Sequence, residues 1–218
     1  MKLIAVLSGG MDSTAAMAVC KHAGHEIIGA ITFDYGSKHN GREFLSALQI
    51  VNHYELKINR VQLDFIADHF KSDLLKTGGE IPEGHYADPS MKRTVVPFRN
   101  GIMLSIAAGF AESLDADGII LGNHFGDHAI YPDCREDFAK AMAQAISLGT
   151  YKNIALVTPF QNMTKTQIVE AGHAIGVPFA LTYSCYKGGE LHCGKCGTCV
   201  ERREAFEQSG INDPTEYA

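Results

Sequence analysis

The sequence has few basic residues and no long apolar run, and each shortage argues against a class of function. Its 218 residues carry 19 Lys and Arg against 25 Asp and Glu, a formal net charge of −6. Because nucleic-acid binding usually requires a basic patch or domain, this balance argues against a tRNA or DNA substrate. No apolar stretch approaches the length of a bilayer span, and the short one at residues 1–7 leads into glycines rather than a cleavage site. We therefore expect a cytoplasmic protein that acts on small molecules, without nucleic-acid or membrane partners.

Internal repeats and low-complexity segments are also missing. The hydrophobic content of 45% and the charged content of 20% are those of an ordinary globular protein. The length allows one sizeable core and a small appendage. We expect a main domain over residues 1–180, with residues 181–218 as a small C-terminal segment packed on it.

Residues 8–14, Ser-Gly-Gly-Met-Asp-Ser-Thr, lack the Gly-Lys-Ser/Thr ending of a Walker A motif, which makes an ordinary P-loop NTPase a poor interpretation. They follow an apolar run and open a helical pattern, so backbone N–H groups at a helix start form an anion site. The segment resembles the pyrophosphate-binding loop (PP-loop) of the N-type ATP pyrophosphatases, Ser-Gly-Gly-x-Asp-Ser. That resemblance implies attack on the α phosphate of ATP. The alternative is a plain strand–turn–helix capped by Asp12 or Ser13.

Strand and helix patterns alternate along the chain. The expected strands are residues 2–7, 26–33, 59–64, 117–122 and 154–158, and the expected helices are 12–23, 40–54, 99–114, 132–147 and 164–175, the last capped by Thr164. This alternation predicts an α/β fold with a five-stranded parallel sheet. Because such sheets bind ligands beyond the carboxyl ends of their strands, the segments to examine are 8–14, 33–39, 122–128 and 159–165. Residues 72–91 predict a long loop, a frequent form of active-site lid.

Four of the six cysteines follow the spacing C-x7-C-x2-C-x2-C, at Cys185, Cys193, Cys196 and Cys199. Four thiolates suit one structural zinc ion. An iron–sulfur cluster and disulfides are the alternatives. We expect His192 to support the site or to be exposed, and Cys20 and Cys134 to be packed core residues.

Three further segments narrow the resemblance: residues 96–101 (Val-Pro-Phe-Arg-Asn-Gly), 131–135 (Tyr-Pro-Asp-Cys-Arg) and 184–203 with the cysteines. Together they resemble the QueC family of 7-cyano-7-deazaguanine synthases, from residue 2 to about residue 207. The resemblance implies a Rossmann-like adenine nucleotide alpha hydrolase fold, with the parallel sheet flanked by helices and a C-terminal zinc-binding segment.

The resemblance also implies a reaction. 7-Carboxy-7-deazaguanine, ammonia and ATP, with Mg²⁺, would give 7-cyano-7-deazaguanine (preQ0) through adenylated carboxylate and amide intermediates. The chain has no room for a glutaminase domain, so free ammonium is the expected nitrogen source. The alternatives are an enzyme that stops at the amide, a tRNA sulfur transferase with an iron–sulfur cluster, and a non-catalytic nucleotide-binding module.

The expected roles follow from these motifs. ATP would contact Leu7, Ser8, Gly9, Gly10, Met11, Asp12, Ser13, Thr14 and Phe33. Asp12, Ser13, Arg99 and Lys165 are the catalytic candidates, with the two cations contacting phosphate or carboxylate. Phe98, Tyr131 and Tyr183 would stack on the deazaguanine, and Asp133 or Asp127 would accept its N–H groups. A homodimer is the expected assembly.

Overall fold

The computed structural model describes residues 1–218, apart from the side chain of His128. Its five strands form one parallel sheet in the order β3-β2-β1-β4-β5. They are β1 (Lys2–Val6), β2 (Glu26–Asp34), β3 (Ile58–Gln62), β4 (Gly118–Ile120) and β5 (Ala155–Val157). The α/β class and the five-stranded parallel sheet are confirmed. Strand order reverses between β1 and β4, which makes the carboxyl ends of these two strands the expected ligand site.

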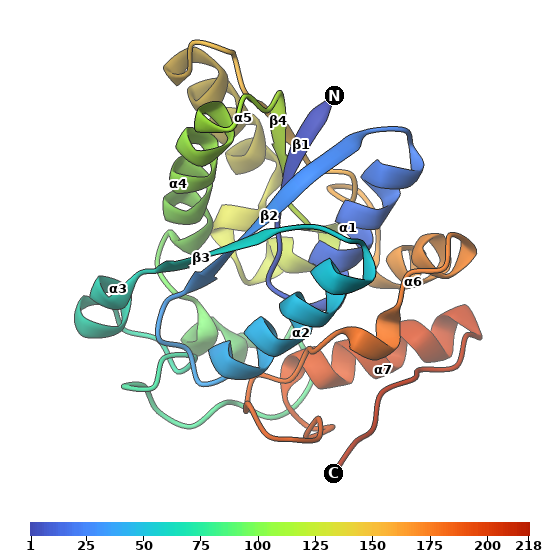
Figure 1. The fold of residues 1–218 in the computed structure, drawn as a ribbon. Coiled ribbons are helices and arrows are strands. Elements are labelled where there is room, and N and C mark those ends of the chain that lie inside the picture. Colours follow the sequence, from blue (N-terminus) through green and yellow to red (C-terminus); the bar gives the residue numbers. More distant parts are fainter.

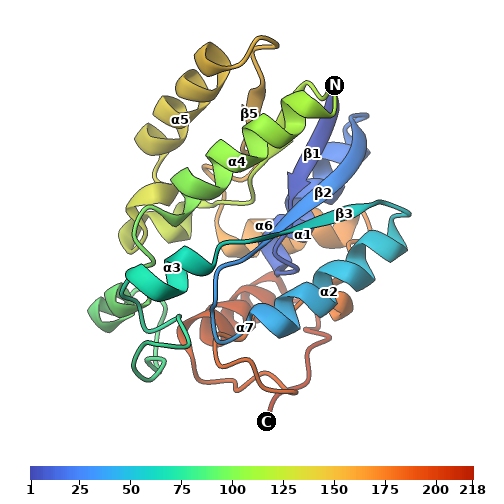
Figure 2. The same cartoon turned by 60° about the vertical axis from the view of Figure 1, so that its left-hand side comes forward.

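Helices cover both faces of the sheet (Figures 1 and 2). They are α1 (Met11–His22), α2 (Asn40–His53), α3 (Asp64–His69), α4 (Arg99–Ser113), α5 (Glu136–Gly149), α6 (Lys165–Ala174) and α7 (Gly197–Ser209). Alternate residues of β1 point to opposite faces: Ile4 packs in the core under α4 and α5, while Leu3 and Ala5 pack under α1, α2, α6 and α7. Within the described chain, no helix is long and apolar enough to cross a bilayer.

One helix boundary and two additional helices differ from the sequence prediction. The helix expected over 132–147 begins at Glu136, after a 3₁₀ turn over Pro132–Cys134, because Arg135 adopts an extended backbone. Helices α3 and α7 were not predicted. Helix α7 lacks a continuous apolar stripe because a charged residue, Arg202, stands on its buried face. Arg202 is fully buried and pairs with Asp213. The cap at Thr164 is confirmed, as its side chain accepts the N–H of Gln167 in a capping box.

The loop over residues 72–91 is packed rather than open. Lys38 fixes its start, because the Nζ atom donates to the carbonyl oxygens of Asp73, Leu75 and Gly79 at 2.6, 2.7 and 2.8 Å. Further along, the N–H of Gly84 donates to the carbonyl of Lys195 at 2.9 Å. The loop is thereby tied to the C-terminal segment that carries the cysteines.

Candidate active site and metal centre

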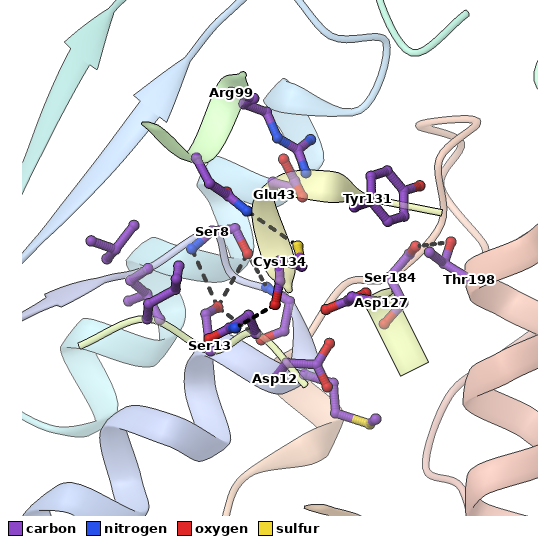
Figure 3. Close-up of a pocket in the computed structure, with 18 of the residues that line it drawn as sticks. Ser8, Asp12, Ser13, Glu43, Arg99, Asp127, Tyr131, Cys134, Ser184 and Thr198 are labelled. Atoms are coloured by element: carbon purple, nitrogen blue, oxygen red, sulfur yellow. Dashed lines mark hydrogen bonds between the residues drawn. The ribbon is translucent and has the colours of Figure 1, made fainter. Parts of the chain in front are cut away.

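A cavity lies at the carboxyl ends of β1 and β4, where strand order reverses. The PP-loop lines one side, residues after β2 line a second, and the C-terminal segment lines a third (Figure 3). Members of these three groups are Ser8, Gly10, Met11, Asp12 and Ser13; Tyr35, His39 and Glu43; and Tyr183, Ser184, Tyr186 and Thr198. The cavity therefore joins the PP-loop to the segment that carries the cysteines.

Backbone geometry shapes the PP-loop. Gly9 adopts φ +88°, and a Cβ there would clash with the carbonyl oxygen of Glu43. The Oγ atoms of Ser8 and Ser13 lie 3.1 Å apart, and the Thr14 hydroxyl donates to the carbonyl of Gly10 at 2.8 Å. No described side chain caps the start of α1. Its first N–H groups therefore remain available for an anion, and Gly9 and Thr14 shape the loop from behind.

Lys165 joins charged residues that are far apart in the sequence. Its Nζ atom lies 2.6 Å from Asp12 Oδ2, 3.1 Å from Glu201 Oε2 and 3.3 Å from His124 Nε2. Burial opposes the charge of Lys165, but Asp12 and Glu201 raise its pKa above the usual value. One buried oxygen, Asp12 Oδ1, has no hydrogen-bond partner among the described residues, and Glu201 Oε2 has only its ion pair with Lys165. The cluster thus keeps acceptor capacity beside the PP-loop.

Arg99 lies across the cavity from this cluster, at the start of α4. Its Nη1 donates to the Tyr35 hydroxyl at 2.9 Å, and its guanidinium lies 5.4 Å from the centre of the same ring. Both cations predicted to contact phosphate or carboxylate therefore line the cavity, Arg99 from the start of α4 and Lys165 from the start of α6.

Tyrosines form the wall nearest the C-terminal segment. The Tyr131 hydroxyl lies 2.8 Å from Thr94 Oγ1 and 3.2 Å from the Tyr186 hydroxyl. Tyr86 donates to Asp127 Oδ1 at 2.8 Å, and the pKa of Asp127 is lowered by His124 and Lys165 despite its burial. These rings offer the apolar faces that a flat heterocycle needs.

Two of the expected substrate contacts lie away from the cavity. Phe98 is 59% exposed, and its ring packs edge-on against Phe138. The carboxylate of Asp133 accepts the N–H of Asn100 at 2.8 Å, so it satisfies the first turn of α4 instead. Tyr131, Tyr183, Phe33 and Leu7 do line the cavity.

Several site residues were not predicted from the sequence: Glu43 and Tyr186, which line the cavity, and His124 and Glu201, which belong to the cluster around Lys165. His39 also lines the cavity. His39 and His124 stand in segments just after strands, and that position is the signal that could have selected them. Glu43 and Glu201 lie on helices, where a single glutamate has the pattern of a solvated residue. No sequence signal distinguishes them.

The four cysteines converge on one point. Their sulfur atoms all lie within 4.8 Å of one another, and those of Cys193 and Cys199 are 4.0 Å apart. A tetrahedral zinc ion with Zn–S bonds of about 2.3 Å requires sulfurs roughly 3.8 Å apart. The N–H groups of Lys195 and Cys196 donate to Cys193 Sγ at 3.4 and 3.3 Å. The donor set therefore fits a metal ion held by four thiolates.

His192 and the other two cysteines, Cys20 and Cys134, make contacts outside this group of four sulfur atoms. His192 is buried, and its Nε2 accepts the N–H of Ser184 at 2.9 Å, which agrees with a supporting role. Cys20 is packed in α1, and burial raises the pKa of its thiol to about 11. Cys134 is also buried, and its sulfur accepts a hydrogen bond from Asn100 at the cavity wall.

A parallel α/β sheet with a Ser-Gly-Gly-x-Asp-Ser loop at its switch point defines the class of PP-loop proteins. The family model for "Queuosine biosynthesis protein QueC" matches residues 2–210, and the chain belongs to this family.

Curated relatives are similar over nearly the whole chain. A 7-cyano-7-deazaguanine synthase of Porphyromonas gingivalis is 52% identical over 212 residues, covering 97% of this chain and 95% of that protein. One of Desulfotalea psychrophila is 50% identical over 214 residues, covering 98% and 97%. Among solved structures, a predicted subunit of tRNA methyltransferase from Methanocaldococcus jannaschii matches with a TM-score of 0.50 at 15% identity, covering 100% of this chain and 92% of that one. This last likeness is one of fold alone.

Proposed function

We propose that this chain is an ATP-dependent C–N ligase of queuosine biosynthesis, which converts 7-carboxy-7-deazaguanine and ammonia into 7-cyano-7-deazaguanine. The observation that carries the proposal is the family match over residues 2–210, with relatives of that name about 50% identical. The cavity supports it, because the PP-loop and a tyrosine wall face one space.

The chemistry explains why an adenylating loop is needed. A carboxylate is a poor electrophile, since its oxygen does not leave. Attack of that oxygen on the α phosphate forms an acyl adenylate and releases pyrophosphate. Ammonia then displaces AMP to give the amide. A second adenylation, on the amide oxygen, lets that oxygen leave as AMP and gives the nitrile, so one site serves both halves.

Residue roles follow from the cavity geometry. Ser8, Gly10 and Ser13 with the free N–H groups of α1 bind pyrophosphate, and Arg99 and Lys165 offset the charge that develops as it departs. Leu7, Met11 and Phe33 contact the rest of the nucleotide. Tyr131 and Tyr183, joined by Tyr186, stack on the deazaguanine, and Asp127 accepts N–H groups from its edge.

Two metal ions belong to the proposal. Zinc on Cys185, Cys193, Cys196 and Cys199 would be structural, since all four of its positions are filled by thiolates. Mg²⁺ prefers carboxylate and phosphate oxygens, and the unpartnered Oδ1 of Asp12 fits it. When bound, Mg²⁺ neutralises phosphate charge during adenylation.

Mass spectrometry of the product is the decisive test. Purified protein is given 7-carboxy-7-deazaguanine, ¹⁵N-ammonium and ATP, and both product and AMP are quantified. The proposal expects a ¹⁵N-labelled nitrile with two AMP for each product molecule. Accumulation of the amide with one AMP indicates an enzyme that stops there. ATP binding without AMP release indicates a non-catalytic module. In a separate metal analysis of the protein, iron with sulfide in place of zinc would indicate the sulfur transferase. The homodimer, the cytoplasmic location and the division at residue 180 stay predictions.

A further inference from the structure

We infer that Glu43 is the catalytic base that accepts protons from the substrate nitrogen when the amide becomes a nitrile. This inference rests on the proposed function and names a residue for its second half.

Position is the first argument. Glu43 lies in the first turn of α2, where its backbone packs directly against Gly9 of the PP-loop. Its side chain is 19% exposed and lines the cavity, next to Arg99 in Figure 3. A group in contact with the adenylating loop is within reach of an intermediate bound to the α phosphate.

Availability is the second argument. The cavity is lined by three carboxylates, and two are engaged: Asp12 by Lys165 at 2.6 Å, and Asp127 by the Tyr86 hydroxyl at 2.8 Å. No described residue donates a hydrogen bond to the carboxylate of Glu43. His39 Nε2 lies 3.6 Å from Glu43 Oε2. Of the three, Glu43 is therefore the carboxylate whose two oxygens both lack a hydrogen-bond donor among the described residues, whereas Asp12 and Asp127 each have at least one oxygen engaged.

His39 supplies the third argument, through its tautomer. Its Nδ1 lies 3.2 Å from the carbonyl oxygen of Tyr186, which can only accept, so Nδ1 carries the hydrogen. Nε2 then presents a lone pair toward Glu43 and toward the Tyr35 hydroxyl, 3.5 Å away. Burial and the charge of Arg99 lower the pKa of His39 to about 3, so the ring stays neutral. A lone pair facing Glu43 stabilises the carboxyl once it has taken up a proton.

The electrostatic surroundings agree. The titratable and charged groups that face Glu43 are His39, Tyr35 and Arg99. Burial raises the pKa of Glu43 to about 8, against the opposing charge of Arg99. A base works best when its pKa lies near the working pH, and this carboxyl meets that condition.

The second adenylation needs such a base, whereas the first does not. In the first adenylation, a carboxylate oxygen bonds to the α phosphorus as the bond to pyrophosphate breaks, and no proton moves. In the second, the amide oxygen makes the same bond while Glu43 takes one N–H proton and later passes it to water. The C–O bond to AMP then breaks, the electron pair of the second N–H bond becomes the new C–N π bond, and Glu43 takes that proton also.

The test separates these halves in the full-length protein. Carboxylate-dependent exchange of ATP with labelled pyrophosphate, measured without ammonium, reports the first adenylation. Nitrile formation from 7-amido-7-deazaguanine and ATP reports the second half. For Glu43→Gln we expect exchange within about twofold of wild type, and nitrile formation slower by about 10²–10⁴-fold, the usual contribution of a general base. The wild-type rate should rise with pH toward a plateau above about pH 8, and the variant should lose this rise.

Two further variants complete the design. Glu43→Asp keeps a carboxylate and should retain part of the nitrile-forming rate together with its pH dependence. Glu190→Gln is the control. Glu190 is 93% exposed and contacts Arg42, which lies beside Glu43 on α2, so both rates should be unchanged. Equal losses of exchange and nitrile formation in Glu43→Gln would assign Glu43 to binding or folding and overturn the inference, as would an unchanged nitrile rate. If the wild type itself performs neither reaction, the proposed function fails and the inference falls with it.

Discussion

The PP-loop and the charged cluster around Lys165 lie next to each other at one cavity, but the first is a continuous stretch of chain and the second is assembled from separate segments. The PP-loop is seven consecutive residues whose shape comes from backbone conformation and from contacts within the loop. The cluster combines Asp12 with His124, Lys165 and Glu201, which lie on four separate segments. A contiguous site is encoded locally, whereas a dispersed one exists only when the whole fold is in place.

The difference sets what a substitution does. In the loop, a change alters conformation and the direction of N–H groups. In the cluster, removal of one charge takes a close partner away from its buried neighbours and changes the charge balance of the site. The cysteine segment resembles the loop, since its four thiols lie within 15 residues of chain, and removal of one thiol should disrupt the whole cluster.

The largest effect is expected at the metal site. Cys196→Ala removes a fully buried ligand, and because metal binding free energy is folding free energy, we expect loss of zinc and several kcal/mol of stability. At about 2–4 °C per kcal/mol, the melting temperature should fall by about 10 °C or more. Zinc content and thermal melting measure this. Cys20→Ala, in α1, is the control and should keep its zinc. An unchanged melting temperature in Cys196→Ala would mean that the metal is not structural.

A loss of activity without loss of fold is expected at the charged cluster. Asp12→Ala removes the closest partner of Lys165 while Glu201 still offsets its charge. We expect turnover to fall by about 10²–10³-fold, the scale of one missing electrostatic group, with zinc content unchanged. Steady-state AMP release measures it. Asp137→Ala, on the exposed side of α5, serves as the control. Wild-type turnover in Asp12→Ala would remove Asp12 from the site.

Two glycine substitutions should distinguish the cost of backbone strain from the cost of a steric clash at the PP-loop, with a smaller loss of stability. Gly9→Ala places a Cβ at φ +88°, only 2.7 Å from the N atom of Ala47. Gly24→Ala has the same φ and nothing within 4 Å. We expect Gly24→Ala to cost about 1 kcal/mol through strain alone. Gly9→Ala should cost about 2–3 kcal/mol and weaken ATP binding, because the loop must shift. Denaturant unfolding and ATP titration compare the two, and equal behaviour would contradict the role of α2 in shaping the loop.

The smallest effect is a pH dependence of stability. Folding raises the pKa of Glu43 from 4.5 to about 8, so between these values the native state binds more protons than the unfolded state. Stability from this group is therefore full below about pH 4.5 and is lost as pH rises toward 8. Because its carboxylate reaches the cavity, we expect only about 1–2 kcal/mol at pH 8. Glu43→Gln should recover this amount at pH 8 relative to wild type. An equal stability difference at pH 6 and pH 9 would refute the shift.

Much of the fold was predictable because its signals are local. Apolar runs located all five strands, and the Thr164 capping signal located the start of α6 to the residue. Helix α7 escaped because a buried arginine interrupts its pattern, and the contact that makes burial possible, Arg202 with Asp213, lies 11 residues on. Phe98 and Asp133 were expected in the substrate site because an aromatic ring and a carboxylate suit a deazaguanine. In the structure the Phe98 side chain is exposed to solvent, and the Asp133 carboxylate accepts the N–H of Asn100 in the first turn of α4.

The sequence by itself determined the PP-loop, the cysteine cluster and the positions of the five strands along the chain, because each depends on spacings of a few residues. Only the tertiary structure decided which charges meet in the cavity. A pair such as Asp12 and Lys165, or a glutamate such as Glu43, acquires its chemistry from burial and from neighbours brought by other elements. Desolvation and close charges act over a few ångströms of space, and the separation of two residues along the chain does not predict whether they lie that close.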